Sequence, residues 1–315
     1  MLALSLTRPD PSDALRPLSS AVEVKRMFHK WGDHVFGNRF SKKEKRLTAK
    51  TSASRIESMF RDYFGDTLLS SSLKPVMVTA FNLVSGQPYL FNSARTGTNI
   101  GGDVPMWQAA RATTAIPTHF PPFRLVIPPS PFRQAYEVCL VDGSLFAGNP
   151  AMMALAEART LFPGEQDLLL VSLGCGEAAE SELRADLQRR RRHIFESSLM
   201  AQSACTDYQL RAFLPSQHYI RIQADLLPEF DRIDDGSQEY LMSMDQIGQE
   251  TILRYAKELD HLVEVLTPGP IQNLELDVAC VKSTSINTNT DPGRRVVEQL
   301  EGTCRLACRF CWVFA

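Results

Sequence analysis

An apolar stretch that ends in an aspartate constrains the fold of this chain more than any other segment. Residues 136–142 have the length and apolar content of a buried strand, and a glycine follows at once. A loop closed by Asn-Pro at 149–150 then leads into a helical run at 151–158. An acid held at the tip of a strand is well placed to act as a general base, so Asp142 is a candidate catalytic residue. The alternative is an ordinary Asp-Gly turn.

Apolar runs of strand length alternate with amphipathic helical runs along most of the chain. This alternation predicts an α/β fold with a parallel sheet covered by helices on both faces. Ser20 and Glu23 have the spacing of a capping box and indicate a helix start. Strands are expected at 75–81, 89–91, 167–176 and, as the last strand, 219–222; helices are expected at 1–7, 20–31, 56–64, from 106, at 189–200, and in a closing segment through about 266.

Composition excludes several classes of protein. The net charge of −2 over 315 residues gives no reason to expect a nucleic-acid partner. No apolar run approaches the roughly 18 residues of a membrane span, and the first apolar stretch is too short for a signal peptide. Seven cysteines favour reduced core thiols in a cytosol over a disulfide framework; Cys139, Cys175, Cys205 and Cys280 lie in mostly apolar surroundings.

A second segment helps to interpret the Asp142 motif. Residues 107–120 read Trp-Gln-Ala-Ala-Arg-Ala-Thr-Thr-Ala-Ile-Pro-Thr-His-Phe. Together the two segments resemble the patatin-like phospholipases, which carry a helix of the form A-R-A-T-S-A-x-P-x-x-F, then a strand ending in D-G-G or D-G-A, then N-N-P. Here Ser144 stands at the third position of the D-G motif, and Gly-Asn-Pro at 148–150 stands for N-N-P.

The resemblance runs from residue 1 to about residue 266. It implies a patatin-like three-layer α/β fold with a mainly parallel sheet that lacks its first strands. Residues 1–266 would form an acyl hydrolase domain that is incomplete at its N-terminus, and residues 267–315 would form a linker and a cysteine-rich tail of unknown role.

The resemblance also implies a lipid acyl hydrolase of lipid degradation that uses a Ser–Asp dyad and no cofactor or metal. Asp142 would be the general base, in the motif Asp142, Gly143 and Ser144, and Gly143 would let the strand end turn tightly. The substrate would be a phospholipid or another acyl lipid. We expect a cytoplasmic location, with peripheral membrane contact as the alternative.

The family's nucleophile motif, G-x-S-x-G, and its oxyanion loop, D-G-G-G-x-R-G, occur nowhere in the printed sequence. Residues 1–9 resemble the helix that directly follows the nucleophile, so we expect a chain truncated at its N-terminus and inactive by itself. A start codon placed too late or a shortened gene would explain this. The alternative is a catalytically dead lipid-binding or regulatory relative that has lost its serine.

Other chemistry-bearing residues carry weaker signals. Cys304, Cys308 and Cys311 have the C-x3-C-x2-C spacing of radical S-adenosylmethionine enzymes, but a tail of four residues after the last cysteine favours a segment without a cluster. Cys175 stands between glycines with no histidine near it in sequence, which argues against a nucleophile. His119 is expected to be structural, with a place near the site as the alternative. The basic residues of 41–55 predict a solvated surface, with contact to anionic lipid headgroups as the alternative.

Overall fold

The structure is a computed structural model that describes residues 1–36, 48–95, 102–117, 119–129, 134–178, 187–226, 235–267 and 311–314. Its helices are α1 (Leu2–Thr7), α2 (Ala21–Phe36), α3 (Thr48–Phe64), α4 (Met106–Thr113), α5 (Ala151–Leu161), α6 (Leu187–Phe213), α7 (Gln238–Arg254) and α8 (Ala256–Leu266). Its strands are β1 (Pro9–Asp10), β2 (Asp13–Pro17), β3 (Met77–Asn82), β4 (Gln87–Asn92), β5 (Phe123–Ile127), β6 (Tyr136–Asp142), β7 (Leu170–Leu173), β8 (Glu177–Ala178), β9 (Tyr219–Ile222), β10 (Asp225–Leu226) and β11 (Cys311–Phe314).

The larger sheet is antiparallel. Its four strands lie in the order β4-β3-β6-β5, and β3 pairs antiparallel with both of its neighbours. The prediction of a parallel strand at 75–81 is therefore wrong in direction, although the strand itself exists. Alternate residues of β3 and β5 are buried, as expected where one face of a sheet meets a core and the other meets solvent.

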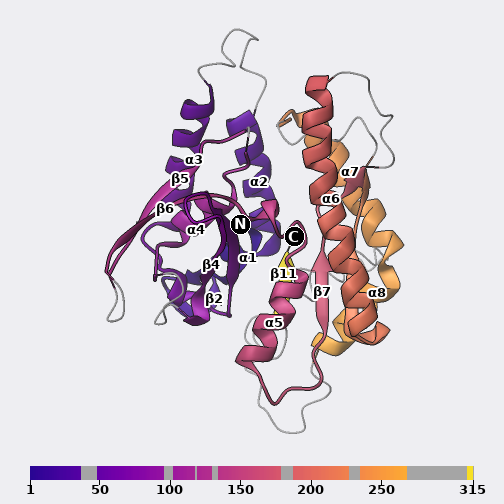
Figure 1. Cartoon of the computed structure of the whole chain (residues 1–315). Coiled ribbons are helices and arrows are strands. Elements are labelled where there is room, and N and C mark those ends of the chain that lie inside the picture. The colour runs from indigo at the N-terminus through magenta and orange to yellow at the C-terminus, as the bar shows by residue number, and fades with distance from the viewer. Residues whose placement is uncertain are drawn as a thin grey trace.

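Helix α4 covers the buried face of this sheet, and α3 packs on α4. The core between them contains aromatic and aliphatic side chains from both layers, including Phe60, Phe91, Trp107 and Leu140. Figure 1 shows this half of the molecule in indigo and magenta, with α2 and α3 beside the strands. The helix expected from residue 106 is confirmed, and it brings the 107–120 segment against the strand that ends in Asp142.

The second sheet is parallel and has the order β11-β7-β9. Helices α6, α7 and α8 lie on its side of the molecule, seen in orange in Figure 1. The expectation that 219–222 is the last strand is wrong, because β10 and β11 follow it. The closing helical segment is also divided in two at Tyr255, whose backbone leaves the helical region.

Two local predictions are confirmed at α2 and α3. Glu23 accepts hydrogen bonds from the Ser20 backbone N–H (2.8 Å) and hydroxyl (3.0 Å), which is the reciprocal contact of a capping box. The helix expected at 56–64 begins earlier, at Thr48, and ends at Phe64 before Gly65, whose φ of 55° suits a glycine.

The mixed arrangement confirms an α/β fold, with parallel pairing confined to β11-β7-β9 and β10-β8 among the described strands. The prediction of buried thiols holds for Cys139 and is wrong for Cys175 and Cys205, which are exposed; Cys280 lies outside the described residues. No helix in the described part of the chain is long and apolar enough to cross a bilayer.

Candidate active site

Backbone hydrogen bonds from two segments fix the position of Asp142. In the ladder between β3 and β6, Asp142 is paired with Ala80. Its backbone N–H donates to the carbonyl of Ala115 (3.1 Å), just after α4. The two segments singled out in the sequence, 107–120 and 136–150, therefore meet at this aspartate.

The Asp142 side chain caps the short 3-10 turn that follows it. One carboxylate oxygen accepts a hydrogen bond from the backbone N–H of Ser144 (2.8 Å), the second residue of the turn Gly143–Leu145. Burial raises the pKa of Asp142, while hydrogen bonding from Ser144 and the positive charge of the Met1 amine act against this rise. The result is a carboxylate with a higher proton affinity than an exposed aspartate has.

Glycine is required at position 143 because the turn after β6 lies very close to β3. A Cβ atom at this position would lie 2.3 Å from Oγ1 of Thr79 and 2.5 Å from the Thr79 carbonyl carbon. Gly143 is not among the glycines of positive φ. The expected glycine thus begins a tight turn, and the reason for glycine at this position is the lack of room beside β3 and not a positive φ.

The amino end of α1 lies near the Asp142 carboxylate. The Met1 amine interacts electrostatically with Asp142, and desolvation by burial lowers the pKa of this amine to about 6. Leu4 and Ser5 of α1 are completely buried. Helix α1 is therefore anchored in the core by Leu4 and Ser5.

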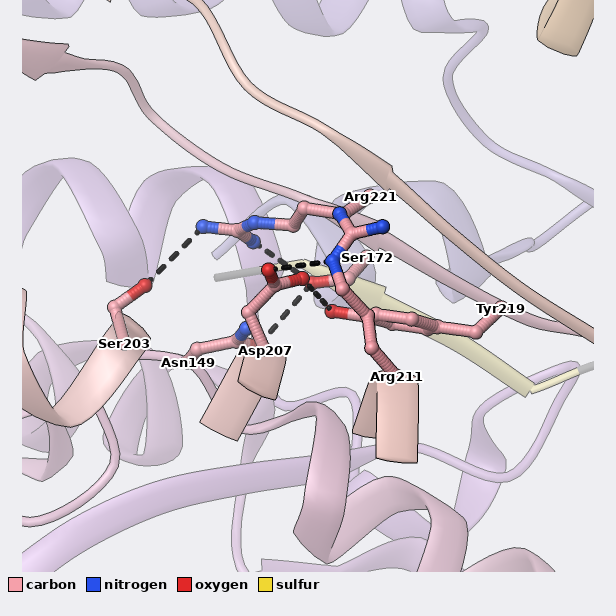
Figure 2. A network of polar contacts seen from close by, with 7 residues as sticks. All are labelled: Asn149, Ser172, Ser203, Asp207, Arg211, Tyr219 and Arg221. Atoms are coloured by element: carbon pink, nitrogen blue, oxygen red, sulfur yellow. Dashed lines mark hydrogen bonds and ion pairs between the residues drawn. The ribbon is translucent and has the colours of Figure 1, made fainter. Parts of the chain in front are cut away.

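Asn149 ties the loop after Asp142 to the second sheet. Its side-chain oxygen accepts hydrogen bonds from the backbone N–H of Ala151 (3.1 Å) and from the hydroxyl of Ser172 on β7 (3.2 Å). Figure 2 shows Asn149 and Ser172 next to Arg221 of β9, which donates to Ser172 (2.7 Å) and to Ser203 of α6 (3.3 Å). The Asn-Pro segment is thus more than a loop closure, because it joins α5, β7, β9 and α6.

The other end of the network in Figure 2 is an ion pair on α6. Arg211 contacts Asp207 (2.7 Å), which also accepts a hydrogen bond from the Tyr219 hydroxyl (2.9 Å). Burial, together with this bond to Asp207, raises the pKa of Tyr219 to about 12. These groups hold α6 on β9. Sequence reasoning missed the network because its members are far apart in the chain and form no motif.

Arg111 of the 107–120 segment has a structural place. Its side chain is buried, pairs with Glu57 of α3 (3.1 Å) and donates to the Pro121 carbonyl (3.0 Å). It thus fastens α4 to α3 and to the connector before β5.

Among the remaining sequence candidates, the cysteines give no sign of a metal site in the described residues. Cys175 and Cys205 are separate exposed thiols. Cys304 and Cys308 lie outside the described residues, and Cys311 begins β11. In the ranges that the structure describes, no three histidine, cysteine or acidic side chains are grouped as metal ligands.

Comparison with known proteins gives one consistent relationship. The family model for "Patatin-like phospholipase" matches residues 1–155, a range that contains α4, β6 and the Asn-Pro segment. Patatin group J-1 and Patatin-11 of Solanum tuberosum are each 24% identical over 279 residues, which cover 81% of this chain and 70% of theirs. Patatin-2-Kuras 3 of the same plant is 24% identical over 277 residues, with 80% and 70% covered.

Proposed function

We propose that this chain, which is similar to the patatin-like phospholipases, is a lipid acyl hydrolase in which Asp142 is the general base. The observation that carries the proposal is the Asp142 carboxyl group at the tip of β6, where the backbone of Ala80 and the carbonyl of Ala115 hold the residue in place. Burial raises the pKa of this carboxyl, which strengthens it as a proton acceptor. The substrate is a phospholipid or another acyl lipid.

The proposed chemistry is a two-step acyl transfer. Asp142 accepts the proton of a serine hydroxyl as the serine oxygen attacks the ester carbonyl. It then delivers that proton to the departing alcohol, and the acyl group stays on the serine as an ester. A water molecule that gives its proton to Asp142 next releases the fatty acid, and the proton returns to the serine oxygen. No metal or cofactor takes part.

The proposed nucleophile is not part of the printed sequence, which contains no G-x-S-x-G. We propose that this serine precedes Met1, because the Met1 amine interacts electrostatically with Asp142. Residues 1–315 therefore supply the base, and we expect negligible ester hydrolysis from them alone, since loss of a catalytic serine costs several orders of magnitude in rate.

Active-site labelling tests the proposal. A fluorophosphonate probe and a nitrophenyl butyrate assay are applied to residues 1–315 and to a form in which the first strand, the oxyanion loop, the next helix and the nucleophile strand with its G-x-S-x-G turn are joined before Met1. We expect labelling and turnover in the extended form only, and a loss of at least a hundredfold in its Asp142→Asn variant. Asp167→Asn, at an exposed position, is the matched control. Turnover that survives Asp142→Asn would exclude Asp142 as the base.

Absence of G-x-S-x-G also supports a second candidate, a lipid-binding relative without catalysis that is cytoplasmic and contacts membranes peripherally. Sedimentation with vesicles of neutral and anionic phospholipid tests it. Binding by residues 1–315, together with an inactive extended form, would favour this candidate over the hydrolase.

A further inference from the structure

All four residues of the tail strand β11 pair with a neighbour in the parallel sheet. Cys311, Trp312, Val313 and Phe314 pair in register with the four residues of β7, from Leu170 to Leu173. On its other side, β7 pairs with β9 through the same four residues. A strand from the far end of the chain thus makes β7 the central strand of its sheet.

Removal of β11 would cost folding free energy, because it would expose one edge of β7. Leu170, Val171 and Ser172 are buried. Without β11, the backbone N–H and C=O groups on one side of β7 would have no ladder partner at a buried position. An unpaired edge of this kind is also a template for another chain.

β11 also lies between two helices of the candidate active-site region. It contacts α1, which follows the Met1 amine that interacts electrostatically with Asp142, and it contacts α5, which begins just after Asn149. Figure 1 shows the yellow strand in this position, beside α5 and β7. The tail strand is therefore inserted where the two sheets of the molecule approach each other.

We propose that the β7 edge is a strand-docking site and that its occupant is the chain's own segment 311–314, bound in cis as a latch. Binding is by main-chain hydrogen bonds in a parallel ladder, the mode of β-strand addition. The latch keeps the edge from pairing with other chains, and through its contacts with both helices it connects α1 to α5. The inference rests on strand pairing and not on the proposed catalysis.

Hydrogen exchange on the full chain tests the latch. Val313→Pro removes a backbone N–H and fixes φ, whereas Val313→Thr keeps a β-branched residue in an ordinary strand backbone. In Val313→Pro we expect the peptide that contains β7 to exchange at least tenfold faster, with peptides from β3 and β6 unchanged. Val313→Thr should match the wild type. Equal β7 protection in both variants and in a chain that ends at residue 310 would overturn the proposal.

A binding measurement covers the case in which a variant does not fold. A fluorescent peptide of residues 309–315 carrying Cys311→Ser is titrated against the full chain and against the chain that ends at 310. We expect saturable binding to the shortened chain only, because the full chain occupies the site itself. Dimers of the shortened chain that dissociate when the peptide is added would also support an open edge. Failure of the peptide to bind the folded shortened chain would refute it.

Discussion

Replacement of Gly143 by alanine should break the contact between the Asp142 turn and β3. The added Cβ would stand 2.3 Å from Oγ1 and 2.5 Å from the carbonyl carbon of Thr79, where unstrained contacts exceed 3.0 Å. A rotated side chain cannot relieve this clash, because the carbonyl carbon belongs to the backbone. The turn must therefore move, and Asp142 must move with it.

The expected cost follows from how firmly Thr79 is held. β3 is paired on both sides, with β4 and with β6, so its backbone cannot retreat. Overpacking of a rigid core costs about 1–3 kcal/mol. Since the overlap here includes a backbone atom of β3, we expect the free energy of unfolding to fall by about 3 kcal/mol, the upper end of that range.

Urea unfolding followed by circular dichroism measures this cost. The matched control is Gly248→Ala in α7, where no atom lies within 4 Å of the new Cβ and where alanine should stabilise by about 0.5–1 kcal/mol. A Thr79→Ala change in the Gly143→Ala background should recover only part of the loss, because the backbone carbon stays in place. If Gly143→Ala had the wild-type free energy of unfolding, the close approach of the Asp142 turn to β3 would be refuted.

Three further outcomes are expected from the same unfolding assay. Glu57→Gln should cost about 2 kcal/mol, because it leaves the buried Arg111 guanidinium without its carboxylate, whereas Glu137→Gln at an exposed ion pair should change nothing measurable. The Met1 amine has a pKa of about 6 when folded and about 8 when unfolded, so the unfolded chain binds the extra proton between these values and stability should rise by about 2 kcal/mol from pH 6 to pH 8. Acetylation of the amine should abolish that rise, and an unchanged rise would exclude Met1 as its source. Asn149→Ala should cost about 1–3 kcal/mol, because Ser172 loses its acceptor, and a cost near zero would contradict a role in joining the sheets.

The sequence predicted the strand that carries Asp142 because its apolar run is bounded by clear turn residues. It did not predict the direction of β3, since a near-continuous apolar run at 75–81 is compatible with either pairing. β5 was missed between two proline-rich connectors, although Phe123, Leu125 and Ile127 alternate with more exposed positions.

The polar contacts around β7 could not be predicted from the sequence, for another reason. Ser172 and Arg221 are ordinary strand residues whose meeting depends on the finished fold. In the tail, the cysteine spacing gives no sign of a strand, while the four residues Cys-Trp-Val-Phe form one whose partner lies far back in the chain. Local pattern predicts an element, but it does not identify a distant partner.

The connection of β7 to β11 has a consequence for how the protein is made. Most pairings of the antiparallel sheet join strands close in sequence, as β3 with β4 and β5 with β6, so they can form soon after synthesis of those residues. β7 must wait until nearly the whole printed sequence has left the ribosome before residues 311–314 can reach it. During that interval a nascent chain carries an open strand edge, which makes it a client for chaperones and a partner for neighbouring nascent copies on the same message.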